Sequence, residues 1–261
     1  MVNILSLDPN LYLNFIIILL RVSGIFITAP ILGSNSVPRT LRVFMALLIS
    51  LIMFNVVPIH GSLPSLSTGD YFLICVKELM VGLLLGIVPK LFFAAVDFAG
   101  TVMGFQMGFS IANVVDPQTD VQVSIIASFK GVVATLLFLA LDGHHIFLEV
   151  MGLSYQKIPI MGFLFTPNKI DYLLRISADL FIIGLQIGAP IIVALMLANI
   201  ILGFMARSIP QMNVFVVGFP FTIGLGFVLL YIGMPYMTLA ITRAIQNMGN
   251  DIINLLEIMA K

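Results

Sequence analysis

Charged side chains are scarce in this sequence, and their scarcity excludes whole classes of protein. Only 9% of its 261 residues are Asp, Glu, Lys or Arg, whereas 60% are hydrophobic. A soluble domain of this length buries its core with far fewer apolar residues, so the composition predicts an integral membrane protein. The 12 basic residues balance the 12 acidic residues. This balance offers no basic face for nucleic acid and no acidic tail for a cationic partner, and we expect no nucleic-acid ligand.

Cysteine and tryptophan are also scarce. Cys75 is the single cysteine, which excludes an internal disulfide, and its apolar surroundings predict a small buried side chain. Because tryptophan is absent, the aromatic belt at the membrane surface rests on the six tyrosines.

Motifs for nucleotide binding or acyl transfer are missing too. The sequence contains no phosphate-binding loop, dinucleotide fingerprint or nucleophile elbow. Its most chemical-looking cluster is Asp142-Gly143-His144-His145, but metal-binding histidines are spaced three or four residues apart on a helix, and adjacent ones diverge. We favour a turn in which Asp142 caps the following helix. We therefore expect no enzymatic activity, no cofactor and no metal.

Long apolar runs dominate what is present. They cover about 11–32, 42–59, 72–96, 98–115, 123–141, 172–206 and 211–241. The first run is long enough to span a membrane by itself, and 172–206 is too long for one simple span. Pro159, Gly162 and Pro167 make residues 154–171 the clearest linker, where we place a structural boundary. The pattern predicts an all-α membrane protein of packed helical hairpins.

The last segment is amphipathic rather than uniformly apolar. Its apolar residues recur at helical spacing, and they are Ile241, Ile245, Met248, Ile252, Leu255 and Met259. The polar face of this expected helix is poor in Lys and Arg, which weakens a membrane-surface position. We favour docking on a partner.

Glycines recur at every fourth position in several runs. The sets are Gly82 and Gly86, then Gly100, Gly104 and Gly108, then Gly184 and Gly188. This spacing puts small residues on one helix face and lets two backbones approach closely. We expect these faces, including Gly100 and Gly104, to pack against other helices.

Charged residues interrupt the apolar runs. Arg21 lies in the middle of the first run, where an arginine costs ~2.5–3.5 kcal/mol on the insertion scale and needs a partner or water. The others are Lys77, Glu78, Lys90, Asp97, Lys130, Asp179 and Arg207. They could form a proton or ion relay, or they could form ion pairs and hydrogen bonds that fix helix contacts. Mixed signs without a compact carboxylate–histidine chain favour the second interpretation, and we assign Arg21, Lys130, Asp142 and Arg207 to helix packing or buried charge.

The segment from Gly100 to Gln118 is neither an ordinary span nor an ordinary loop. It begins as a glycine-spaced helix, continues as a stretch rich in Phe and Met, and ends in Asp116-Pro117-Gln118. A backbone that faces lipid must stay helical, and a loop that faces water is polar. This segment is therefore predicted to lie sheltered inside a protein assembly.

Several motifs, taken in order along the chain, resemble the FliR family of flagellar biosynthetic proteins, which includes the corresponding injectisome subunit. The motifs are Arg21-x-x-Gly24, Asn113-Val-Val-Asp116-Pro117-Gln118, Leu141-Asp-Gly-His144-His145, and Ala206 to Pro220. The resemblance covers essentially the whole chain, and the Val-Asp-Pro-Gln form is more flagellar than injectisome-like.

The resemblance implies a place in the core of the type III export gate of the bacterial inner membrane, at the flagellar basal body. Its partners would be FliP-, FliQ- and FlhB-type subunits, membrane lipid and unfolded flagellar export substrates. A single copy would complete a helical ring-like hetero-oligomer, with residues 1–165 similar to a FliP-type subunit and residues 166–261 similar to a FliQ-type subunit.

The resemblance also implies a pore plug between Phe105 and Gln122. The candidate plug residues are Phe105, Gln106, Met107, Gly108, Phe109, Ser110, Ile111, Asn113, Asp116, Pro117 and Gln118. Large Phe and flexible Met side chains suit a seal that yields to a passing chain, and Gly104 and Gly108 permit close approach or a hinge. Without the resemblance, Phe105 and Phe109 would be assigned to membrane core packing.

Two other functions stay open. The first is a small-solute secondary transporter or channel that uses Lys130, Asp97 and Asp179 as a relay, although no convincing inverted repeat relates the two halves. The second is a structural scaffold whose loop never gates a path.

Overall fold

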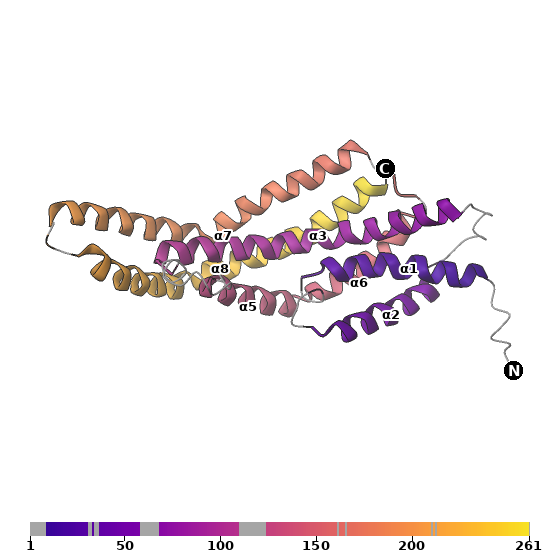
Figure 1. The fold of residues 1–261 in the computed structure, drawn as a ribbon, viewed down its shortest axis with the longest axis horizontal. Helices are drawn as coiled ribbons and strands as arrows, with labels where there is room; N and C mark the ends of the chain where they lie inside the picture. Colours follow the sequence, from indigo (N-terminus) through magenta and orange to yellow (C-terminus); the bar gives the residue numbers. More distant parts are fainter. Residues whose placement is uncertain are drawn as a thin grey trace. The chain divides into compact units, whose positions relative to one another are not determined.

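The described part of the chain is built from helices. The computed structural model describes residues 9–30, 33, 37–57, 68–109, 124–160, 162–164, 166–209, 211 and 213–260. Its helices are α1 (Pro9–Thr28), α2 (Arg39–Val56), α3 (Thr68–Met107), α5 (Ile125–Ala140), α6 (Gly143–Lys157), α7 (Pro167–Ser208) and α8 (Val214–Ala260) (Figure 1). The described residues contain no strand, and the predicted all-α class is confirmed.

Two compact units share the chain, and each draws on separate stretches of sequence. Unit 1 consists of residues 1–91, 144–176 and 248–261, and unit 2 consists of residues 92–143 and 177–247. Long stretches of α3, α7 and α8 belong to each of the two units. The predicted linker does separate two helices, because α6 ends at Lys157 and α7 begins at Pro167. The likeness of the parts before and after this linker to FliP- and FliQ-type subunits stays a prediction.

α3 joins two apolar runs that the sequence analysis separates. The runs 72–96 and 98–115 are divided by Asp97, whereas α3 continues through Asp97 and ends at Met107. The Asp97 side chain is exposed, so its charge requires no break in the helix. Pro89 lies inside α3 without ending it.

The lengths of the helices fit a membrane protein. Four helices, α2, α3, α7 and α8, are long and apolar enough to cross a bilayer, and α5 with α6 makes a fifth if the two form one broken span. α1 has 20 residues, and its apolar part within the described residues, Tyr12–Thr28, is shorter than the four helices above. The expectation that the first run spans by itself therefore stays a prediction.

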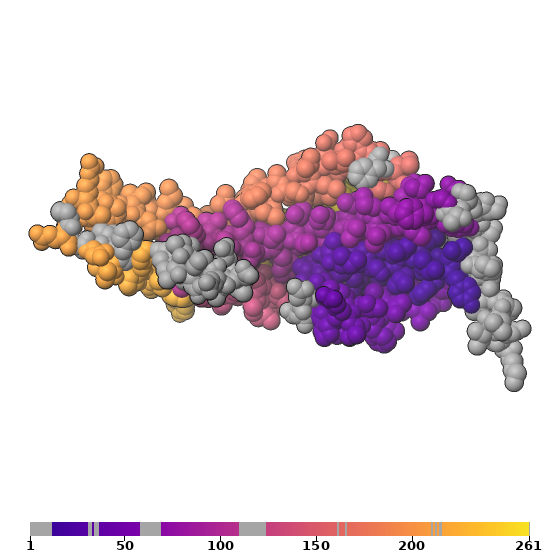
Figure 2. Space-filling view, viewed as in Figure 1, coloured from indigo at the N-terminus to yellow at the C-terminus, as the bar shows by residue number. Residues whose placement is uncertain are grey.

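Unit 1 contains a close crossing of α1 and α3. A Cβ on Gly24 would lie 2.7 Å from the carbonyl oxygen of Leu79, and a Cβ on Gly82 would overlap the carbonyl oxygen of Arg21. Only glycine allows the two backbones to approach this closely. On another side of α1, α2 packs through an edge-to-face contact of Phe54 with Phe15, whose ring centroids are 6.1 Å apart. The side chains of α1 and α2 together form a continuous surface of the unit (Figure 2).

The amphipathic stripe at the end of α8 is buried within the chain. Each of its six apolar residues is 3% exposed or less, and they are Ile241, Ile245, Met248, Ile252, Leu255 and Met259. In unit 1 the Tyr172 hydroxyl donates a hydrogen bond to the Asp251 carbonyl at 3.4 Å, and Lys157 forms an exposed ion pair with Glu257 at 3.8 Å. The helical periodicity is therefore confirmed, but the surface on which the stripe docks belongs to this chain and not to a partner.

The crossing of α1 and α3 leads to a stability prediction. Replacing Gly82 with Ala should lower the free energy of unfolding by about 1–3 kcal/mol, because the new methyl group meets backbone that cannot rotate away. Gly152→Ala in α6 is the matched control, since a Cβ there has nothing within 4 Å and should change stability by less than about 1 kcal/mol. Unfolding of both variants in detergent checks the expectation, and equal effects of the two substitutions would contradict it.

Candidate functional site at the end of α3

The candidate plug begins where α3 ends, and this end has a defined cap. Gly108 has a positive φ of 95°. Its amide donates to the Phe105 carbonyl at 3.0 Å, and the amide of Phe109 donates to the Gly104 carbonyl at 3.1 Å. These two hydrogen bonds and the left-handed residue form a Schellman motif, the usual way in which a glycine stops a helix. The chain therefore leaves the helix at Gly108 for a local backbone reason.

Two other helices of unit 2 hold this end of α3. The Thr222 hydroxyl of α8 donates to the Met107 carbonyl at 3.0 Å, which satisfies a carbonyl group that the helix leaves free. The Met107 side chain is fully buried, and a Cβ on Gly226 would lie 2.5 Å from its terminal methyl carbon. From α7, the Asn199 amide donates to the Gln106 backbone carbonyl and to its side-chain Oε1, each at 3.1 Å.

The aromatic residues on either side of the cap differ in their surroundings. The Phe109 ring makes an edge-to-face contact with Phe227 of α8, with 6.2 Å between ring centroids. Phe105 is 67% exposed in this chain, so the core packing that its sequence context favours is not found. A Cβ on Gly108 would lie 2.9 Å from the Phe219 ring, so the cap is tight as well as left-handed.

The structure therefore brings part of the candidate plug together. Gln106, Met107, Gly108 and Phe109 lie against α7 or α8, and Phe105 is on the surface. The remaining candidates lie outside the described residues, and they are Ser110, Ile111, Asn113, Asp116, Pro117 and Gln118. The contacts of Thr222, Asn199 and Phe227 were missed by the sequence analysis, because nothing local in sequence relates α7 and α8 to the end of α3.

Gly100 and Gly104 face α5 at its beginning. A Cβ on Gly100 would overlap the backbone of Ala127, and one on Gly104 would overlap the Ser124 hydroxyl. The same hydroxyl caps α5, where it accepts a hydrogen bond from the Ala127 amide at 3.4 Å. The glycine spacing thus fits the contact of α3 with the first turn of α5.

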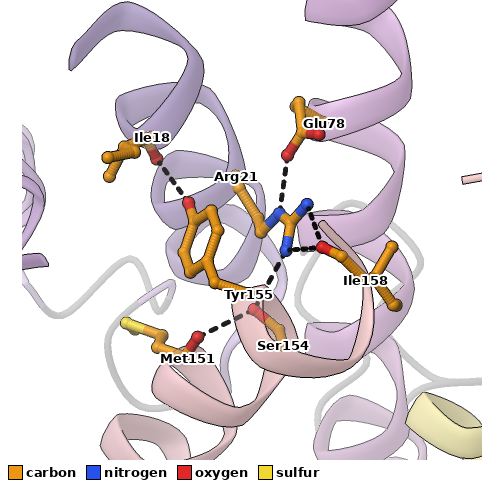
Figure 3. A network of polar contacts seen from close by, with 7 residues as sticks. All are labelled: Ile18, Arg21, Glu78, Met151, Ser154, Tyr155 and Ile158. Carbon is orange, nitrogen blue, oxygen red and sulfur yellow. Dashed lines mark hydrogen bonds and ion pairs between the residues drawn. The ribbon is translucent and has the colours of Figure 1, made fainter. Parts of the chain in front are cut away.

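A second polar centre lies in unit 1, where Arg21 is completely buried (Figure 3). Its Nε donates to Glu78 Oε2 of α3 at 2.6 Å, and both terminal nitrogens donate to the Ile158 carbonyl at 3.1 Å. Nη1 also donates to the Ser154 hydroxyl at 3.3 Å. The guanidinium carbon lies 4.1 Å from the centre of the Tyr155 ring, and the Tyr155 hydroxyl donates to the Ile18 carbonyl of α1 at 3.3 Å. Arg21 therefore joins α1, α3 and the end of α6.

Lys130 is the other buried cation among the predicted residues. It is 2% exposed, and its Nζ lies 3.5 Å from the Met103 sulfur, a weak acceptor and its single polar contact in the described part of the chain. The proposed relay would join Lys130 to Asp97 and Asp179. No hydrogen bond or ion pair links these three side chains within the described ranges, and Asp97 is exposed.

Two predicted buried charges are exposed in this chain. Arg207 lies in the last turn of α7, where a cation interacts favourably with the free carbonyl groups of the helix end. Asp142 follows α5 with a positive φ of 55°, a backbone conformation that Asp tolerates in turns. The turn expected at Asp142 is present, but its burial is not.

The Arg21 centre gives a second stability prediction. Arg21→Met should lower the free energy of unfolding by about 3–5 kcal/mol, because it leaves the Glu78 carboxylate buried without its partner. The double variant Arg21→Met with Glu78→Leu should recover most of this loss, since no charge is then buried. Lys157→Met, which removes the exposed Lys157–Glu257 pair, is the control and should cost at most about 1 kcal/mol. A double variant as unstable as Arg21→Met in detergent unfolding would show that the buried charge is not the cause.

Comparison with known proteins places the whole chain in one family. The family described as bacterial export proteins, family 1, matches residues 12–248. The flagellar biosynthetic protein FliR of Bacillus subtilis is 35% identical over 254 residues, which cover 96% of this chain and 97% of that protein. FliR of Escherichia coli is 32% identical over 238 residues, with 91% and 89% covered, and FliR of Aquifex aeolicus is 28% identical with 87% of each covered. The match extends from α1 across the capped end of α3 and through most of α8, and the chain belongs to family 1 of the bacterial export proteins.

Proposed function

We propose that this chain is a core subunit of the flagellar type III protein-export apparatus in the bacterial inner membrane. The observation that carries the proposal is the family match over residues 12–248, together with FliR relatives that align with nearly their whole length. The subunit acts as part of the conduit for unfolded flagellar proteins. It is a structural component, and the driving force for export comes from elsewhere in the apparatus.

The dimensions of the helices support an assembly with other subunits. α7 has 42 residues, which at 1.5 Å each extend for about 63 Å, roughly twice the hydrocarbon thickness of a bilayer. Large apolar side chains are exposed along nearly all of it, from Leu174 through Leu185 and Leu197 to Phe204. A single crossing of a hydrocarbon core about 30 Å thick cannot cover the whole length of such a helix. Other protein subunits therefore cover part of it, and we propose FliP-, FliQ- and FlhB-type subunits around a single copy of this chain.

The capped end of α3 supports a plug in the following segment. Gly108 stops the helix, and α7 and α8 hold residues 106–109 through hydrogen bonds and a buried Met107. A segment that seals a pore needs a fixed attachment to the rest of the protein, because otherwise its apolar side chains would not stay in the pore. We propose that the apolar residues after Phe109 close the path when no substrate is present.

Co-purification tests membership of the assembly. When this chain carries an affinity tag and is expressed with the FliP-, FliQ- and FlhB-type proteins of the same organism, we expect these to be retained with it. Native mass spectrometry of the complex should give one copy of this chain. A chain that purifies alone as a stable monomer or homo-oligomer, with no partner retained, would support a small-solute transporter instead.

Replacement of residues 110–118 by a Gly/Ser linker of equal length tests the plug. We expect ion leakage across the inner membrane of cells that express the whole apparatus, because the linker lacks the apolar side chains of Ile111, Val114 and Val115, which would exclude water. A linker of the same length in place of residues 59–67 is the matched control and should leave conductance at the wild-type level. Wild-type conductance of the 110–118 variant in an assembled complex would reject the plug and leave the export role intact.

A further inference from the structure

A polar groove lies between α7 and α8 in unit 2, apart from the end of α3. It has a volume of about 380 Å³ and is lined on its polar side by Gln186 of α7 and by Tyr236, Arg243 and Asn247 of α8. Its apolar side includes Ile187 and Ala244, which are 1% and 7% exposed. The Tyr236 hydroxyl donates to the Gln186 carbonyl at 3.3 Å and so ties the two helices together beside the groove.

The position of Arg243 in the sequence of α8 is unusual. No charged residue occurs from 214 to 242, and Arg243 is the first charge of the helix. Beyond it α8 becomes polar on one side, with Gln246, Asn247 and Asn250. Arg243 therefore marks the point at which the apolar part of the helix gives way to a polar part, which is where arginine and tyrosine gather at a membrane surface.

The groove has the chemistry of an anion site. The Arg243 side chain is exposed, and within the described residues it forms no ion pair and no hydrogen bond. Its guanidinium carries five N–H donors, and the amides of Gln186 and Asn247 add more, while none of the described residues that line the groove carries a carboxylate. A single carboxylate would be satisfied by the guanidinium alone. Several donors on one groove better match a phosphate group, which presents more acceptor oxygens.

Exposed apolar side chains near the groove indicate what carries the phosphate. Ile182 and Leu185 of α7 are 55% and 49% exposed, and Ile232 and Leu239 of α8 are 68% and 49% exposed. Ile182 and Leu185 lie within about a turn of Gln186 on α7. Ile232 and Leu239 lie within about a turn of Tyr236, on the part of α8 that precedes Arg243. A lipid with its headgroup at Arg243 could thus lay its acyl chains on apolar surface, whereas a soluble phosphate would leave that surface uncovered.

We propose that this groove binds the phosphate headgroup of an anionic phospholipid, with Arg243 as its principal ligand. Basic pockets between membrane helices recognise such headgroups through charge and donor number. The site depends on residence in a membrane and is independent of the plug, so the two proposals fail separately.

Native mass spectrometry of the full-length protein in detergent tests the site. The protein is titrated with phosphatidylglycerol or with phosphatidylcholine, and wild type should retain phosphatidylglycerol in preference. Arg243→Gln should weaken phosphatidylglycerol retention about five-fold, the effect of one arginine at a lipid surface. Arg243→Lys should keep most of the phosphatidylglycerol binding. Arg175→Gln, which removes an exposed arginine in a different helix, α7, should retain phosphatidylglycerol as well as wild type does.

Three outcomes would overturn the proposal. Equal retention of the two lipids by wild type would remove the headgroup selectivity. Displacement of phosphatidylglycerol by inorganic phosphate would identify a soluble anion as the ligand. Unchanged lipid retention by Arg243→Gln, with loss of a partner subunit from the co-purified complex, would assign the groove to a partner's carboxylate. Gln186→Leu provides a second test that keeps the arginine, and it should also reduce the preference for phosphatidylglycerol.

Discussion

The buried guanidinium of Arg21 holds three parts of unit 1 together, which are α1, α3 and the end of α6. A charge in that position is tolerated only when its donors are satisfied, and no single helix can do this. Glu78 supplies the countercharge from α3, the end of α6 supplies the Ile158 carbonyl, and Tyr155 supplies its ring. The arginine therefore fixes which stretches of chain must meet. In a membrane, the hydrophobic effect between apolar side chains would neither drive contact nor specify the partners, because lipid tails are as apolar as leucine side chains.

The close crossing of α1 and α3 depends on the same pair of helices. Gly82 lies one turn after Glu78 on α3, and the face of Gly82 where a side chain would stand is against the Arg21 carbonyl group. The backbone contact at Gly82 and the Arg21–Glu78 ion pair thus lie within one turn of each other on α3. The glycine allows α1 and α3 to approach closely, and the ion pair fixes the register between the two helices. Glu78 Oε1 has no hydrogen-bond partner among the described residues, so the centre contributes specificity at some cost in stability.

The sequence predicts periodic features of this fold well and long-range contacts poorly. The stripe from Ile241 to Met259 is found buried as expected, because helical spacing is a local property. The surface against which this stripe packs comes from parts of the same chain that are distant in sequence, so the local spacing does not reveal it. Arg21 was known to need a partner, but the choice of Glu78 over other carboxylates depends on how α1 crosses α3. Arg207 and Asp142 are exposed in this chain, because both occur at helix ends beside the apolar runs.

The end of α3 combines a local cap at Gly108 with contacts to the distant helices α7 and α8. Gly108 was recognisable as a point of flexibility, and the Schellman cap shows that its freedom is used to stop the helix. The contacts of Thr222, Asn199 and Gly226 then join that stop to two long helices through neutral hydrogen bonds and packing, with no ion pair among the described residues. A force that reaches Phe109 would therefore be passed to α7 and α8 as well as to α3. The gate proposed above could then yield to a passing chain without unwinding the helix that precedes it.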